Sequence, residues 1–154
     1  MFTWDQGWQA ELPDEAATCA LAAHLAAACR PGQGIALVGE MGAGKTTLVR
    51  GLAIALGTPS PSEVSSPTYA LMHEYPTAGP PLVHVDLWRL DGAAAAAALG
   101  LDEALERKDA VVVVEWAERA WSLLPAGSWG VRLAAGAAGG RLAWVVGAPP
   151  RGPR

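Results

Sequence analysis

A glycine-rich segment at residues 39–47, GEMGAGKTT, restricts the folds open to this chain more than any other feature. Before it lies the apolar run GIALV at 34–38, which is typical of a strand buried on both faces. After it, apolar residues recur at helical spacing between Leu48 and Leu56, and Gly57 follows as a helix stop. This order predicts a strand, a glycine loop and a helix in direct succession.

Residues 39–46 also fit the pattern G-x-x-x-x-G-K-[ST]. Its glycines let successive backbone amides turn toward one centre at a helix N-terminus, where they bind phosphate oxygens. In such a loop Lys45 bridges the β- and γ-phosphates, the Thr46 hydroxyl ligates Mg²⁺, and Thr47 reaches the α-phosphate. The alternative is an ordinary glycine-rich turn. We expect a nucleotide phosphate site formed by Gly42, Ala43, Gly44, Lys45, Thr46 and Thr47.

Three further polar residues stand where a phosphate site needs them. Glu115 follows the apolar run 111–114, and the end of a buried strand is where such proteins place a second acidic group for Mg²⁺. Thr68 follows the Ser/Pro-rich loop 58–67 and is placed to contact the γ-phosphate or the metal. Asp86 lies on the polar face of a predicted strand, where a carboxylate can orient the attacking water or complete the metal shell. The alternatives are an exposed strand-end carboxylate, a strand-start threonine and a solvated strand face, respectively.

The rest of the chain alternates between strand and helix patterns. Asp14 is a predicted N-cap of a helix that ends near residue 30. In a strand over 82–88, the apolar residues at odd positions form one face and His84, Asp86 and Trp88 form the other. Further strands are expected within 1–12 and at 68–74, 110–114, 131–134 and 142–146, the last two as a terminal hairpin, and further helices at 93–98, 102–107 and 118–124.

Length and charge exclude several other classes of protein. A chain of 154 residues has the size of one domain, which we expect at 1–148, followed by a disordered Pro/Arg-rich tail at 149–154. The net charge is −4, which argues against a broad basic face and against direct binding of DNA or RNA. No apolar stretch approaches the ~18 residues of a membrane span, so we expect no membrane association and a cytoplasmic protein. The histidines are scattered, which disfavours a zinc site.

The motifs also separate the kinds of nucleotide-binding protein. A GTPase needs an [NT]-K-x-D segment to bind guanine, and the surroundings of Lys108 lack that frame. A small-molecule kinase needs an acceptor pocket and an Arg-rich lid. The segment 86–89 could imitate an acceptor motif, but 92–109 is too rich in alanine to be a convincing lid. An ATPase with low intrinsic turnover, coupled to a partner protein, is therefore favoured, and a small-molecule kinase is the alternative.

The sequence resembles one family, the bacterial tRNA threonylcarbamoyladenosine biosynthesis ATPase TsaE. Many proteins share the glycine loop, but SPTY, H-x-D-L-x-R and EW following it in that order are specific. The chain departs from the family pattern at Trp88, where Tyr is usual, and at Ala117, where Pro is frequent. Five segments carry the likeness, GEMGAGKTTLVRGL at 39–52, SSPTY at 65–69, HVDLWRL at 84–90, the LG before an acidic helix at 99–106, and VVEWAE at 113–118.

This resemblance implies a single α/β P-loop NTPase domain with a mixed, mostly parallel sheet flanked by helices, which agrees with the antiparallel hairpin expected at the C-terminus. The implied cofactors are ATP, bound by Lys45 and the loop, and Mg²⁺, held by Thr46 and Glu115. The likeness further implies a switch-like segment around Thr68 and a need for Asp86 in hydrolysis. It places Thr18, Trp116 and Glu118 beside the adenine.

The resemblance also implies partners. Members of the family associate with the TsaD and TsaB proteins, which transfer a threonylcarbamoyl group to the adenosine beside the anticodon. ATP hydrolysis by the family member permits repeated cycles, and tRNA is met only indirectly through the complex. An acidic accessory subunit without a basic face fits this expectation.

Overall fold

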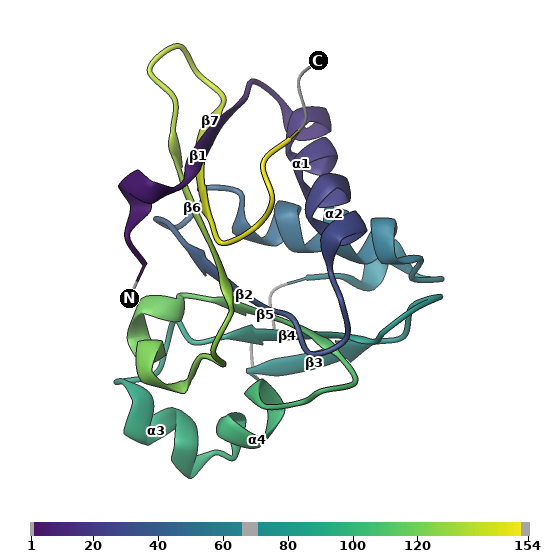
Figure 1. Ribbon diagram of the computed structural model, residues 1–154, viewed down its shortest axis with the longest axis vertical. Helices are drawn as coiled ribbons and strands as arrows, with labels where there is room; N and C mark the ends of the chain where they lie inside the picture. The colour runs from purple at the N-terminus through teal and green to yellow at the C-terminus, as the bar shows by residue number, and fades with distance from the viewer. Residues whose placement is uncertain (1, 66–70, 152–154) are drawn as a thin grey trace.

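A seven-stranded sheet runs through the computed structural model, which describes residues 2–65 and 71–151 (Figure 1). The strand order is β1-β7-β6-β2-β5-β4-β3. The ladders β6–β2, β2–β5 and β5–β4 are parallel, whereas β1, β7 and β3 are added antiparallel at the two sides. The predicted mixed α/β sheet is confirmed. The strands are Trp8–Leu12 (β1), Gly34–Val38 (β2), Met72–Tyr75 (β3), Leu82–Asp86 (β4), Val111–Glu115 (β5), Trp129–Ala135 (β6) and Arg141–Val146 (β7).

Helices cover both faces of this sheet. Helices α1 and α2 pack on one face, and α3, α4 and the 3₁₀ helix η3 pack on the other, at the opposite side of the sheet in Figure 1. The predicted N-cap of α1 is confirmed, because Asp14 accepts a 2.8 Å hydrogen bond from the amide of Ala17. No helix within 2–65 and 71–151 has the length and apolarity to cross a membrane. The helices are Glu15–Ala28 (α1), Lys45–Leu56 (α2), Ala93–Ala98 (α3) and Leu101–Leu105 (α4), with shorter 3₁₀ turns at Trp4–Gln6 (η1), Pro61–Glu63 (η2) and Ala117–Leu123 (η3).

The alternation of side chains along the central strands decides which polar groups meet. In β5, Val111 and Val113 pack toward α1 and α2, whereas Val112 and Val114 pack toward α3 and α4. Glu115 continues the first series, so its side chain emerges on the α2 face. In β4, Val83 and Val85 likewise pack toward α3 and α4, which leaves the residues at positions 84 and 86 on the α2 face.

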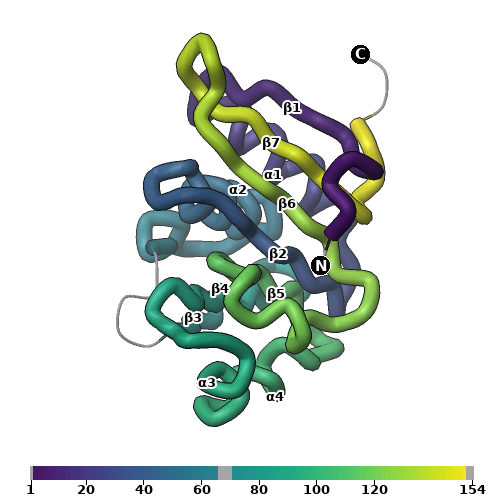
Figure 2. Tube along the Cα trace, turned by 90° about the vertical axis from the view of Figure 1, so that its left-hand side faces the viewer, coloured from purple at the N-terminus to yellow at the C-terminus, as the bar shows by residue number. Residues whose placement is uncertain are grey.

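Three antiparallel strands form one side of the sheet, where Figure 2 shows β1, β7 and β6 running side by side. The edge strand expected near the N-terminus and the C-terminal hairpin are both present, and the hairpin strands are longer than the pattern predicted. Pro149 is held at the surface, where its carbonyl oxygen lies 2.9 Å from Nε2 of His24. Disorder over the whole tail 149–154 stays a prediction, because 152–154 lie outside the described residues.

Among the other element boundaries that differ from the sequence prediction, two have a clear local cause. Strand β4 ends at Asp86 rather than continuing to Trp88, because the Asp86 side chain accepts a hydrogen bond from the Trp88 amide and turns the chain. Helix α4 begins at Leu101, directly after Gly100 in a left-handed conformation, so Asp102, where the sequence predicted the helix to start, lies within the first turn.

Candidate functional site

The glycine loop joins β2 directly to α2, as the sequence predicts. Gly42 and Gly44 have φ angles of +79° and +100°, a region that favours glycine, and Lys45 is the first helical residue. The first amides of a helix have no partner within the helix, and they carry the positive end of its dipole. The loop therefore presents amide donors at the start of α2, as an anion-binding site requires.

Lys45 is almost fully buried, with 5% of its surface exposed. Its ammonium group donates to the carbonyl oxygens of Gly39 and Glu40, at 2.5 and 2.8 Å, and lies 4.5 Å from the centre of the Trp116 ring. Burial lowers the pKa of Lys45 below its usual value, although Glu115, with other nearby carboxylates, opposes that shift. The loop thus holds a desolvated cation at its centre. A bound anion would attract this ammonium group more strongly than the two neutral carbonyls do.

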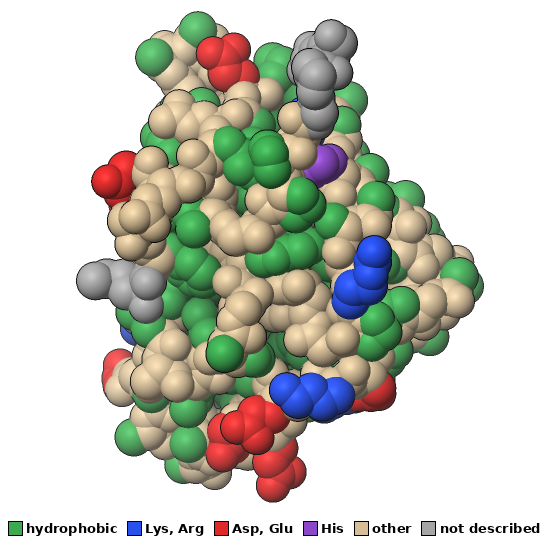
Figure 3. Space-filling model, in the orientation of Figure 1, with side chains coloured by type: hydrophobic (Ala, Val, Ile, Leu, Met, Phe, Trp, Pro, Cys, Tyr) green, Lys and Arg blue, Asp and Glu red, His purple; other side chains and the backbone are tan. Residues whose placement is uncertain are grey.

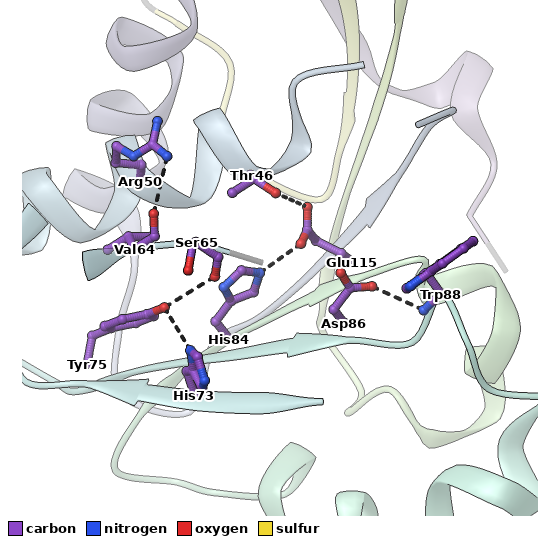
Figure 4. Close-up of polar contacts among 10 residues, drawn as sticks. All are labelled: Thr46, Arg50, Val64, Ser65, His73, Tyr75, His84, Asp86, Trp88 and Glu115. Carbon is purple, nitrogen blue, oxygen red and sulfur yellow. Dashed lines mark hydrogen bonds and ion pairs between the residues drawn. The ribbon is translucent and has the colours of Figure 1, made fainter. Parts of the chain in front are cut away.

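The end of β5 faces the start of α2 across the cleft (Figure 4). Glu115, 2% exposed, accepts a 3.1 Å hydrogen bond from the Thr46 hydroxyl at Oε1. Its other oxygen, Oε2, lies 2.9 Å from Nε2 of the fully buried His84. The alternative of an exposed strand-end carboxylate is therefore wrong for Glu115. His84 fixes the orientation of this carboxylate toward α2, in the way that outer-shell groups orient ligands.

Asp86 lies beside Glu115, because the two residues are register partners at the ends of β4 and β5. It is 6% exposed, so its strand face is not solvated. Its Oδ1 accepts a 3.1 Å hydrogen bond from the Trp88 amide, as Figure 4 shows. Burial, with Glu115 as a smaller contributor, raises the pKa of the Asp86 carboxyl above its usual value. A carboxylate with a raised pKa is a better proton acceptor than an exposed one.

These groups line one cleft of about 430 Å³. It is open to solvent at Met41, whose side chain is 71% exposed, and at Trp88. The structure thus brings together most of the residues predicted to bind phosphate, metal and water. The lining consists of Met41, Gly42, Gly44, Lys45, Thr46, Thr47, Asp86, Trp88, Glu115 and Trp116.

A second cleft of about 410 Å³ lies on the other flank of the loop and shares Gly42, Gly44 and Thr47 with the first. Thr18 lines this second cleft together with Arg141, whereas Trp116 lines only the first. The three residues that the resemblance places beside the adenine are therefore not brought together in one cleft.

Glu118 lies in η3 and lines neither cleft, and its Oε2 is buried with no hydrogen-bond partner among the residues that the structure describes. Thr68 lies outside the described residues, so its predicted contact with the γ-phosphate or the metal stays a prediction.

Sequence reasoning missed two residues of the site. His84 could have been found, because it shares the face of β4 with Asp86 and that face meets the end of β5. Arg141 gave no local signal, because it belongs to the C-terminal hairpin and reaches the loop only through the sheet.

The donor set suits Mg²⁺. The Thr46 hydroxyl and the carboxylates of Glu115 and Asp86 are oxygen donors, and Mg²⁺ in nucleotide sites takes only one or two protein ligands besides phosphate oxygens and water. Within the described part of the chain no cluster of three or more His, Cys, Asp or Glu residues could hold a metal alone. The residues therefore suit a metal that is bound together with a phosphate ligand.

The order of strand, glycine loop and helix in a mainly parallel sheet, with acidic side chains at the adjacent strand ends, defines a protein of the P-loop class. The family model described as "Threonylcarbamoyl adenosine biosynthesis protein TsaE" matches residues 12–142. This chain belongs to the TsaE family, which takes part in the biosynthesis of threonylcarbamoyladenosine in tRNA.

Individual relatives agree with this assignment. The chain is 46% identical over 106 residues to the tRNA threonylcarbamoyladenosine biosynthesis protein TsaE of Streptomyces coelicolor, an alignment that covers 64% of this chain and 66%, just under two thirds, of that protein. It is 38% identical to the protein of the same name from Aquifex aeolicus, over 70% of this chain and 75% of the relative. The crystal structure of YdiB from Bacillus subtilis matches with a TM-score of 0.67 and 29% identity, over 90% of this chain and 82% of that chain.

Proposed function

We propose that this protein is a Mg²⁺-dependent ATPase whose hydrolysis supports repeated cycles of the TsaD–TsaB threonylcarbamoyl transferase. One observation carries the proposal: the buried Lys45, the Thr46–Glu115 pair and the buried Asp86 converge in one cleft at the start of α2. The family's place in tRNA modification supports the partners and a cytoplasmic compartment. tRNA is then reached through the complex and not by this chain alone.

In this proposal the loop amides bind the phosphates, and Lys45 leaves the carbonyls of Gly39 and Glu40 to donate to the β- and γ-phosphate oxygens. Thr46 and Glu115 hold Mg²⁺, which when bound neutralises charge on the phosphate oxygens. Asp86 orients the attacking water and accepts its proton, and its raised pKa suits that role.

The two clefts divide the nucleotide between them. Thr47 lines both clefts, so a triphosphate seated on the loop can extend from the first into the second. We assign the adenosine to the second cleft beside Thr18. Trp116 and Glu118 are assigned to the phosphate end, because the Trp116 ring packs on Lys45 and the Glu118 charge acts on the same ammonium group.

The proposal is tested by measuring phosphate release from Mg·ATP with and without TsaD and TsaB. We expect slow release by the protein alone and faster release with both partners. ADP formed only in the presence of a phosphorylated metabolite would instead support the alternative, a small-molecule kinase that uses Asp86 as the acceptor base. Equal release with and without the partners would contradict the coupling.

A Glu115→Gln variant tests the metal assignment. Glutamine keeps the size of the side chain and an acceptor for the Thr46 hydroxyl but removes the charge that holds the cation. We expect ATP turnover to fall by at least about 100-fold while some ATP binding is retained. Turnover at the rate of the unmodified protein would show that Glu115 does not hold the metal.

A further inference from the structure

Arg141 lies at the first position of β7 and reaches the glycine loop. Its Nη2 donates to the Gly42 carbonyl oxygen at 2.9 Å, and its Nε donates to that of Ala43 at 3.2 Å. A third bond, from Nη1 to the carbonyl of Gly140 at 2.8 Å, anchors the guanidinium group on its own hairpin. One planar cation therefore bridges two consecutive loop carbonyls and the sheet.

The backbone of Arg141 is fixed from both sides. It is the register partner of Leu12 in β1 and of Ala135 in β6. Gly140, just before it, has a φ of +62°, and a Cβ atom there would lie 2.6 Å from the Leu12 carbonyl oxygen. Only glycine fits this close approach, so the sheet and the hairpin turn determine where the arginine side chain starts.

Holding these carbonyls has a consequence for the amides of the loop. The carbonyl oxygens of such a loop lie outside the regular hydrogen-bond pattern of the strand and the helix, so they need other donors. In this structure Lys45 serves the carbonyls of Gly39 and Glu40, and Arg141 serves those of Gly42 and Ala43. If Lys45 turns to a bound phosphate, Arg141 is the side chain of this pair that continues to hold the loop.

We propose that Arg141 is a positioning residue for polyphosphate binding, which holds the loop carbonyls at Gly42 and Ala43 so that the amides from Gly44 onward face the phosphates. This proposal rests on the proposed nucleotide site. It adds that the C-terminal hairpin, through one guanidinium group, is part of the phosphate-binding machinery. The positive charge of Arg141 also lines the second cleft beside Thr47, where it favours an anionic ligand.

The test measures binding of inorganic tripolyphosphate with Mg²⁺ by calorimetry, which does not depend on hydrolysis. We expect Arg141→Gln to weaken binding about tenfold, because two charge-assisted hydrogen bonds to the loop are lost. Arg141→Lys keeps the charge but not the planar pair of donors. Its affinity for tripolyphosphate is expected to lie between those of the unmodified protein and Arg141→Gln. In hydrogen exchange without ligand, the amides of residues 42–47 are expected to exchange faster in Arg141→Gln. In ATP hydrolysis KM should rise while kcat stays within about twofold.

Arg132→Gln is the matched control, because it removes the same charge from the neighbouring strand β6. The Arg132 guanidinium stacks on Trp4 and Trp144, at 5.3 and 4.4 Å from the ring centres, and does not line the clefts at the loop. Equal losses of binding in Arg132→Gln and Arg141→Gln would overturn the proposal.

The remaining outcomes separate this inference from the proposed function. Tight tripolyphosphate binding by the unmodified protein with no loss in Arg141→Gln overturns only the role of Arg141. Failure of the unmodified protein to bind ATP or tripolyphosphate overturns the nucleotide site itself and this inference with it. If Arg141→Gln does not fold, Arg141→Lys decides, and unchanged affinity in that variant overturns the proposal.

Discussion

At the scale of single residues, Asp86 is a carboxylate that the fold holds in an unfavourable place. It is buried beside a second carboxylate, Glu115, and its only hydrogen-bond donor among the described contacts is the Trp88 amide. Burying a charge costs stability unless it is well paired, and functional sites often carry such costs. Lys45 lies near Asp86 in the cleft but makes no direct ion pair with it. Its positive charge therefore offsets only part of the free-energy cost of burying the carboxylate.

We therefore expect Asp86→Asn to stabilise the fold while it slows the proposed hydrolysis. Asparagine keeps the acceptor for the Trp88 amide and removes the buried charge. The free energy of unfolding should rise by about 1 kcal/mol at pH 7, measured by urea unfolding. Phosphate release should fall at least about 100-fold.

The pH dependence follows from the raised pKa of Asp86. At acid pH the Asp86 carboxyl is protonated in both the folded and the unfolded state. The wild-type protein and the Asp86→Asn variant should then be equally stable. As pH rises through the unfolded and then the raised folded pKa, the wild-type protein loses stability relative to the variant. The stabilisation by Asp86→Asn should therefore shrink on acidification. Asp91→Asn, an exposed site, is the control, and an equal gain there would contradict the explanation.

At the scale of elements, the close contact of α1 and α2 fixes the helix that carries Lys45 and Thr46. Gly51 in α2 faces α1, and a Cβ atom built on it would lie 2.7 Å from the Cβ of Ala22 and 3.3 Å from the Cα of Cys19. The backbones of α1 and α2 approach each other at Gly51. The close packing there compensates for the low helix propensity of glycine.

Gly51→Ala is accordingly expected to destabilise the protein, although alanine favours a helix by about 1 kcal/mol. The added methyl group meets Ala22 and should cost a net 1–3 kcal/mol, roughly, in the free energy of unfolding, measured by urea unfolding with tryptophan fluorescence. Ile54→Ala, at a half-exposed position of the same helix, should change stability by less than about 0.5 kcal/mol. A more stable Gly51→Ala protein would show that the two helices are not closely packed there.

At the scale of the whole molecule, the charges argue against direct binding of nucleic acid. On the face drawn in Figure 3 the basic side chains form small separate groups, with acidic side chains nearby. Several arginines are engaged within the protein: Arg107 pairs with Glu74 and Asp109, and Arg141 binds the loop. With a net charge of −4, little positive charge remains for a polyanion.

We expect this protein alone not to bind tRNA at physiological salt, with a dissociation constant weaker than about 100 µM in fluorescence anisotropy. The same labelled tRNA is mixed with TsaD and TsaB as a control, which checks that the tRNA preparation can be bound. Saturable binding of the isolated protein at low micromolar concentration, weakened by added salt, would contradict the indirect role proposed for tRNA.

The sequence by itself determined the features that depend on neighbouring residues. The strand, loop and helix around Lys45, the N-cap at Asp14 and the alternation along 82–86 all follow from patterns within about ten residues. The strand patterns also marked Glu115 and Asp86 as candidate site residues, the resemblance agreed with both, and the structure brings both to the loop.

Tertiary structure alone decided which distant groups meet. Residues 31 apart join in the His84–Glu115 pair, residues 69 apart in the Thr46–Glu115 bond, and residues 99 apart in the bond from Arg141 to Gly42. Only the order of strands in the sheet sets these pairings, and no local spacing encodes that order. Tertiary structure likewise decided that Thr18 and Trp116 line two different clefts. A cleft is a space between elements, and its lining exists only once those elements have packed.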